Sequence, residues 1–274
     1  SAASDVYKRQ QADKELISIL KSINHPFVQA FAAYFEENPA NYTEALLKIE
    51  QHVSELEKRD DYTIEQKALI FVIQSWVYGQ KGDITVLKQI HKEIKELIDD
   101  FETNPIVQYG LQDAFLNVVW WYLHFGVDAD VRGLLKFIEP YVLKNKFYKT
   151  YTTFLNVKGA VESFLGDNVS AKESFQQLVE VHSKYNDTYR LSIAIGNLAE
   201  VYVAMGRIQE AKDMMEKAIQ MYKESTGQWP YLYLVEIGNI YYVLDDPRAE
   251  EYFLQAYEIQ KKEVSMHKAF ILYE

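Results

Sequence analysis

Apolar residues recur along most of this chain at the three- and four-residue spacing of amphipathic helices. Residues 43–58 show the pattern clearly, with apolar side chains on one face and alternating charges on the other. Residues 64–80 are apolar nearly all round, which predicts a helix buried between neighbouring helices. Alternation with a period of two is scarce, and glycine and proline fall mainly between the apolar segments. The pattern predicts a protein that is nearly all-α.

The same spacing predicts further helices, at residues 11–23, 84–101, 108–125, 130–143 and 263–273. Asp61 or Thr63 is a suitable N-cap for the helix that follows. Pro140 should kink the helix over residues 130–143 or end it near Glu139. Residues 1–10 are small and polar, and we interpret them as a disordered leader or a remnant that is not native.

Residues 193–222 have the pattern of two helices joined by a glycine turn. Small and bulky residues stand where two antiparallel helices must approach closely, namely Ala199, Tyr202, Gly206, Ala211, Met215 and Ala218. The preceding segment aligns through Gly159, Gly166, Ala171, Phe175 and Leu178, and the following one through Gly238, Tyr241, Ala249, Phe253 and Ala256. The chain therefore contains an internal repeat.

This order of small, aromatic and turn residues resembles the tetratricopeptide repeat family. The steps from Ala171 to Ala211 and from Ala211 to Ala249 are 40 and 38 residues, longer than the roughly 34 of the standard unit. The resemblance implies a right-handed superhelical solenoid of about six helix pairs over residues 11–274. Its repeats are divergent over residues 11–146 and regular over 147–274, where the helix at 263–273 would cap the array.

In a tetratricopeptide array, the first helix of each pair lines the concave face. Four asparagines recur in the predicted first helices at steps of 39, 41 and 42 residues: Asn117, Asn156, Asn197 and Asn239. An amide side chain offers both a donor and an acceptor, so such a ladder could hold the backbone of an extended peptide. The alternative is that some of these asparagines form interhelical hydrogen bonds or recur by chance.

Other residues are also predicted to face this groove, namely Thr153, Glu200 and Tyr242, with Trp76 and Trp120 in the N-terminal half. Glu200 and the net charge of −11 favour a peptide that carries a positive charge or a free N-terminus. The tryptophans could anchor apolar side chains of a partner, or they could belong to the core. Some tetratricopeptide proteins hold a C-terminal carboxylate with groove cations, which this chain lacks at the matching positions Ile193, Gly196, Glu200, Leu232 and Val235.

Composition and motifs argue against several classes of function. The surplus of acidic residues argues against binding to nucleic-acid phosphate. The absence of cysteine removes disulfides and thiolate metal sites and agrees with a cytoplasmic location. The sequence has no phosphate loop, HExxH motif or nucleophile elbow, and its six histidines are scattered. No catalytic residue, cofactor or metal is predicted, and no apolar run is long enough to span a membrane.

The first hypothesis is therefore a cytoplasmic, non-catalytic scaffold that binds a basic or apolar protein or peptide segment in the concave groove. The alternative is a peptide-sensing regulator. Long degenerate repeats with groove asparagines are similar to those of peptide-pheromone receptors of Gram-positive bacteria and their phages, here without a DNA-binding domain of its own. An enzyme has no support in the linear sequence, and a homo-oligomer is possible on either reading.

Overall fold

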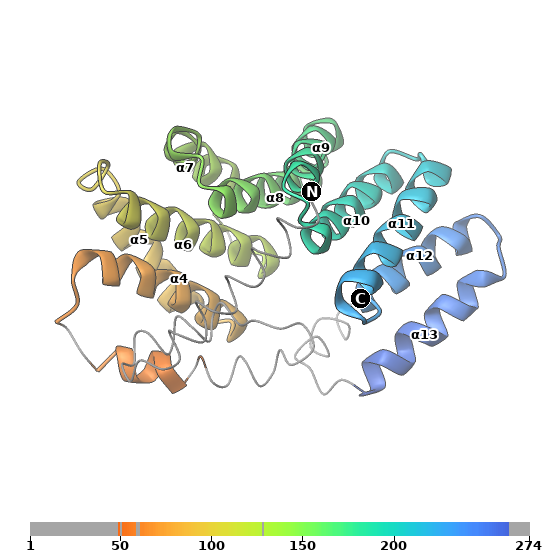
Figure 1. Ribbon diagram of the computed structural model, residues 1–274, viewed down its shortest axis with the longest axis horizontal. Coiled ribbons are helices and arrows are strands. Elements are labelled where there is room, and N and C mark those ends of the chain that lie inside the picture. The colour runs from red at the N-terminus through yellow and green to blue at the C-terminus, as the bar shows by residue number, and fades with distance from the viewer. Residues whose placement is uncertain (1–48, 50, 59–60, 128, 263–274) are drawn as a thin grey trace. The chain divides into compact units, whose positions relative to one another are not determined.

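The computed structural model describes residues 49, 51–58, 61–127 and 129–262. Every regular element in this part of the chain is a helix, and no strand occurs in it (Figure 1). Consecutive helices run in alternating directions and form antiparallel pairs, which confirms the predicted all-α repeat fold. The segments expected at residues 1–10, 11–23 and 263–273 lie outside the described residues.

The helices have the following bounds: α4 (Ile64–Gln80), α5 (Ile84–Leu97), α6 (Pro105–His124), α7 (Val131–Asn145), α8 (Tyr148–Phe164), α9 (Asn168–Lys184), α10 (Thr188–Ala204), α11 (Ile208–Thr226), α12 (Tyr231–Val243) and α13 (Arg248–Lys262). The helix predicted over residues 64–80 is confirmed at both ends. The one predicted over residues 84–101 ends four residues early, at Leu97.

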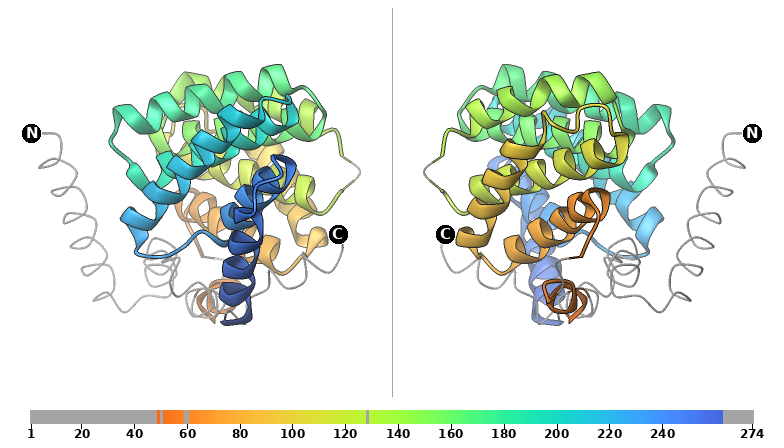
Figure 2. Two further views of the ribbon diagram at one scale, coloured as in Figure 1. Left: turned by 90° about the vertical axis from the view of Figure 1, so that its right-hand side faces the viewer. Right: turned by 90° about the vertical axis from the view of Figure 1, so that its left-hand side faces the viewer.

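The described residues group into two compact units, which divide between Val161 and Glu162 within α8. In the first unit α4 packs against α5 and α6, and α6 against α7. In the second unit α10 packs against α9 and α11, and α12 packs against α11 and α13 (Figure 2). The boundary expected between divergent repeats up to residue 146 and regular repeats from residue 147 stays a prediction.

Side chains at the helix starts explain why the helices begin where they do. Thr63 is confirmed as the N-cap of α4, since its hydroxyl accepts a hydrogen bond from the Gln66 amide at 3.3 Å. The Gln66 side chain accepts one from the Thr63 amide in return, at 3.0 Å, which completes a capping box. Aspartates cap four later helices in the same way, namely Asp83, Asp130, Asp167 and Asp187.

The turns within the pairs need a left-handed residue. Gly206 has a φ of 74°, and the next amide, that of Arg207, donates to the Tyr202 carbonyl at 2.9 Å. In the turn between α12 and α13, Asp245 occupies the equivalent position with a φ of 56°. Aspartate tolerates this conformation better than most residues, so the turn forms without glycine.

Helix α7 runs past Pro140 to Asn145, which excludes the alternative that it ends near Glu139, while a kink at Pro140 stays a prediction. Pro140 lacks an N–H group, so the Lys136 carbonyl one turn earlier loses its helical partner. Both residues are exposed, which leaves that carbonyl accessible to water. The missing hydrogen bond is therefore tolerated on this side of the helix.

The α4–α6 contact forms the centre of the first unit. Leu111 and Phe115 of α6 are fully buried, and so is Asp113, whose carboxylate lies 3.1 Å from Lys149 Nζ of α8. At Gly110 the two backbones approach so closely that a Cβ atom would lie 2.6 Å from the Ala68 carbonyl oxygen. None of the described helices combines the length and the hydropathy that crossing a bilayer requires.

Gly110→Ala should lower the free energy of unfolding by about 2 kcal/mol, because the added methyl group meets backbone that cannot rotate away. Chemical denaturation of the full chain measures this loss. Gly206→Asn is the matched control, since nothing lies within 4 Å of its added Cβ, and it should cost less than about 1 kcal/mol. Equal losses for the two variants would contradict the close approach of α4 and α6.

Candidate functional site

In the first unit, Asn117 takes part in a contact between helices. Its Nδ2 donates a hydrogen bond to Ser75 Oγ at 3.2 Å, which connects α6 to α4. The Ser75 hydroxyl in turn donates to the Val72 carbonyl at 2.9 Å. This contact matches the alternative in which some of the four asparagines link neighbouring helices.

The two tryptophans of the first unit make intramolecular contacts. Trp76 is partly buried and packs against the core cluster that contains Ile73 and Val77. The Trp120 ring lies against His124, with 4.1 Å between the ring centroids. These contacts favour a role in packing over a role as partner anchors.

Helix α8 carries Thr153 and Asn156, which stand one turn apart and are both partly buried. The intervening Phe154 and Leu155 point into the core of the unit. The structure thus brings Thr153 and Asn156 onto one face of α8, where their contact with a ligand stays a prediction.

The second unit places four polar side chains on two neighbouring first helices. Asn197 and Glu200 stand one turn apart on α10, and Glu236 and Asn239 one turn apart on α12. We call these four residues the amide–carboxylate patch. Glu200 and Asn239 are exposed, while Asn197 and Glu236 are partly buried.

The repeat alignment explains the composition of this patch. A step of 39 residues relates Tyr202 to Tyr241, and the same step relates Asn197 to Glu236 and Glu200 to Asn239. Each position thus carries an amide in one repeat and a carboxylate in the other. Glu236 was not predicted, because the recurrence of asparagine was followed and not the residue at the position equivalent to Asn197. The repeat step of 39 residues would have identified it.

Tyr233 holds α12 against α10. Its hydroxyl donates a hydrogen bond to the Ile193 carbonyl at 3.2 Å, and burial raises the pKa of Tyr233, so the group stays a neutral donor. The ring covers Gly196 so closely that a Cβ atom there would lie 2.5 Å from Tyr233 Cζ. The glycine within the predicted helix was the only sequence sign of this contact.

Glu200 has a raised pKa. Burial, and secondly the negative charge of Glu236, raise the pKa of Glu200 to about 7. The side chain is nevertheless exposed, so solvent screens part of this effect. Two carboxylates on facing helices create a negative potential that an ammonium or guanidinium group would relieve.

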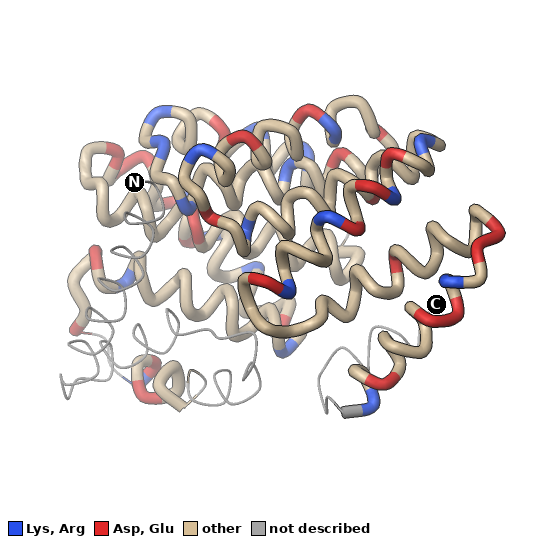
Figure 3. The backbone as a smooth tube through the Cα atoms, turned by 45° about the vertical axis from the view of Figure 1, so that its right-hand side comes forward, with Lys and Arg blue, Asp and Glu red and all other residues tan. Residues whose placement is uncertain are grey.

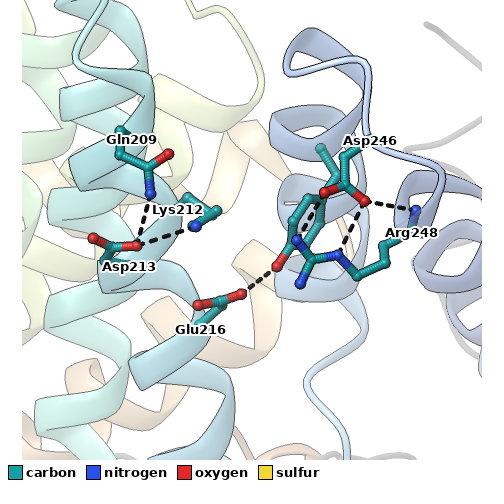
Figure 4. A network of polar contacts seen from close by, with 7 residues as sticks. Gln209, Lys212, Asp213, Glu216, Asp246 and Arg248 are labelled. Atoms are coloured by element: carbon teal, nitrogen blue, oxygen red, sulfur yellow. Dashed lines mark hydrogen bonds and ion pairs between the residues drawn. The ribbon is translucent and has the colours of Figure 1, made fainter.

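A network of polar contacts fixes α12 from the other side (Figure 4). The Tyr241 hydroxyl donates to the Glu216 carboxylate of α11. The Arg248 guanidinium lies over the Tyr241 ring, 4.2 Å from its centroid, and donates to both Asp246 carboxylate oxygens, at 3.0 and 2.7 Å. These hydrogen bonds lower the pKa of Asp246 to about 2. Helices α11, α12 and α13 are thereby joined.

Tyr242, which was also predicted to face the groove, stands one turn beyond Asn239 at the end of α12. It lines a hollow formed with α13. The described residues contain no group of three or more histidines or carboxylates that could bind a metal ion.

Residues 150–224 match the sequence model of the tetratricopeptide repeat. No curated protein matches the chain. Among solved structures 13 chains match, including a signal transduction ATPase with numerous domains that has a tetratricopeptide repeat sensor, from Pyrococcus horikoshii. The identity is 15% and the TM-score 0.47, over 91% of this chain and 51% of that one, so this chain spans about half its length.

Glu200→Gln should stabilise the protein at pH 8 and leave its stability nearly unchanged at pH 4. Below pH 4.5 the carboxyl is neutral in both states, but between pH 4.5 and 7 it ionises only in the unfolded chain. The wild type therefore loses stability as the pH rises, by about 1 kcal/mol after solvent screening. Denaturation at both pH values, with Glu173→Gln as the control, measures this difference. A gain of equal size at pH 4 would contradict the raised pKa.

Asn117→Ala should lower the free energy of unfolding by about 1 kcal/mol, because the Ser75 hydroxyl loses a partner at the α4–α6 contact. The double variant Ser75→Ala/Asn117→Ala should cost less than the sum of the two single variants. Strict additivity of the two changes would show that the hydrogen bond contributes nothing to stability.

Proposed function

We propose that the chain binds an extended, positively charged segment of another protein at the amide–carboxylate patch. The match of residues 150–224 to the tetratricopeptide repeat, a protein-interaction scaffold, supports this proposal. The observation that carries the proposal is that Glu200 on α10 lies near Glu236 on α12, each one turn from an asparagine. Binding involves no chemical step and no cofactor.

The two carboxylates give the patch its preference for a cation. Partial burial, and secondly the charge of Glu236, raise the pKa of Glu200, although solvent at its exposed side chain screens part of this effect. A lysine, an arginine or a free N-terminal amine placed between them would favour the ionised form. Such a ligand should therefore release a proton on binding below pH 7.

The two amides suit the backbone of the bound segment. Asn197 and Asn239 each provide a donor and an acceptor, as a peptide group does. Because an amide can pair with the peptide backbone whatever side chains the peptide carries, these residues would add affinity without selecting for a particular peptide sequence. Tyr233 supports the arrangement by fixing the distance between α10 and α12.

Peptides selected from a random display library on the wild-type chain provide the test. The selected sequences should be enriched in lysine and arginine or should bind through a free N-terminus. The affinity of the peptides that contain lysine or arginine should rise from pH 6 to pH 8 as Glu200 ionises, and it should fall with added salt. Calorimetry on synthetic copies of the selected peptides measures both dependences.

Glu200→Gln should weaken binding of these peptides about tenfold at pH 8 and abolish the dependence on pH. Glu173→Gln removes the same charge from the exposed surface of α9 and should leave affinity unchanged. Asn197→Ala should weaken charged and uncharged peptides alike. Selected peptides that bind Glu200→Gln as tightly as the wild type would exclude the patch as the binding site.

A further inference from the structure

A hollow of about 710 Å³ opens where the end of α12 meets α13. Its apolar lining includes Tyr242, Phe253, Leu254 and Tyr257. Tyr242 is 76% exposed, and Leu254 and Tyr257 are each 57% exposed. Exposed apolar side chains that share one hollow usually mark a contact surface.

The lining of this hollow also carries negative charge. Asp245, Asp246 and Glu250 belong to it, and acidic residues gather around the turn between α12 and α13 (Figure 3). Arg248 forms an ion pair with Asp246, so the remaining charge of the lining comes from the exposed Asp245 and Glu250. A second copy of this chain, with its net charge of −11, would bring like charge to this surface. The hollow therefore favours an apolar ligand group on a positively charged segment.

One helical turn separates the hollow from the amide–carboxylate patch. Tyr242 follows Asn239 by three residues on α12, and Asn239 follows Glu236 by three, so each is adjacent to the next on the helix surface. From Glu236 to Tyr242 the helix rises about 9 Å, a distance that an extended chain covers in about three residues. One short segment can therefore contact the carboxylates and the hollow at the same time.

We propose that the segment bound at the patch also inserts a large apolar side chain, two or three residues from its cation, into the hollow between α12 and α13. This inference rests on the proposed function, because the cation at Glu200 and Glu236 sets the position of the segment. Leu254 and Tyr257 lose water-exposed apolar area in the complex, which adds affinity to that of the cation. The hollow thereby selects among cationic sequences, which the asparagines of the patch do not.

Displayed peptides with one fixed lysine test the inference on the full chain. Four random positions precede the lysine and four follow it, between glycine–serine linkers, and a parallel library has serine in place of the lysine. Selection on the wild type should enrich large apolar residues two or three positions from the lysine. Selection on Leu254→Ser should lose this preference and still require lysine. The matched control Val169→Ser, at a side chain 58% exposed on α9, should keep both.

Calorimetry on one selected peptide measures the size of the effect. Replacing its apolar residue by serine should weaken binding to the wild type about tenfold. The same replacement should weaken binding to Leu254→Ser less than about threefold, because the contact is already lost. On Val169→Ser the replacement should again weaken binding about tenfold.

Three results would overturn the role of the hollow. The first is a set of peptides that need lysine and Glu200 but show no preference for a nearby apolar residue, which would leave the proposed function standing. The second is equal binding of peptides with lysine and with serine, which would overturn the proposed function as well. The third is a dimer of the chain that Leu254→Ser dissociates, because a second copy would then occupy the hollow.

Discussion

The structure depends on how closely its helices can approach one another, and small residues set that distance. At Gly110 the backbone of α6 meets the carbonyl of Ala68 on α4, and at Gly196 the ring of Tyr233 fills the place of a side chain. Any Cβ at these two positions would collide with buried atoms. The packing density of the repeats therefore rests on a few positions where nothing larger than hydrogen fits.

Close packing at the pair interfaces leaves specific positions of the first helices free to vary. On α10 and α12 the residues that face each other are apolar and buried, while the positions one turn away carry amides and carboxylates. Tyr233 bridges the two helices at one place, and the Glu216–Tyr241–Arg248 contacts hold α12 at another. The scaffold held by these contacts thus presents the polar groups of α10 and α12.

Sequence reasoning predicted the fold well where local signals were strong. The dense apolar pattern placed both ends of α4, and Thr63 was one of the two N-caps that the sequence offered. Helix α7 was harder, because whether Pro140 ends a helix depends on the exposure of the Lys136 carbonyl, which no local pattern records. The bond between Asn117 and Ser75 joins residues 42 positions apart and could not be seen in the sequence. Glu236 could have been found from the repeat step, because it stands at the position equivalent to Asn197.

Amide and carboxylate positions are reversed between α10 and α12, and this has a consequence for the direction in which a peptide can bind. Asn197 is equivalent to Glu236, and Glu200 to Asn239, so the four groups form a checkerboard on two parallel helices. A rotation of 180° about an axis perpendicular to the patch places each amide on the other amide and each carboxylate on the other carboxylate. A peptide lying across the patch would meet the same sequence of groups from either end. These four side chains would hold a segment without choosing its N-to-C direction, and that choice would fall to the surrounding residues.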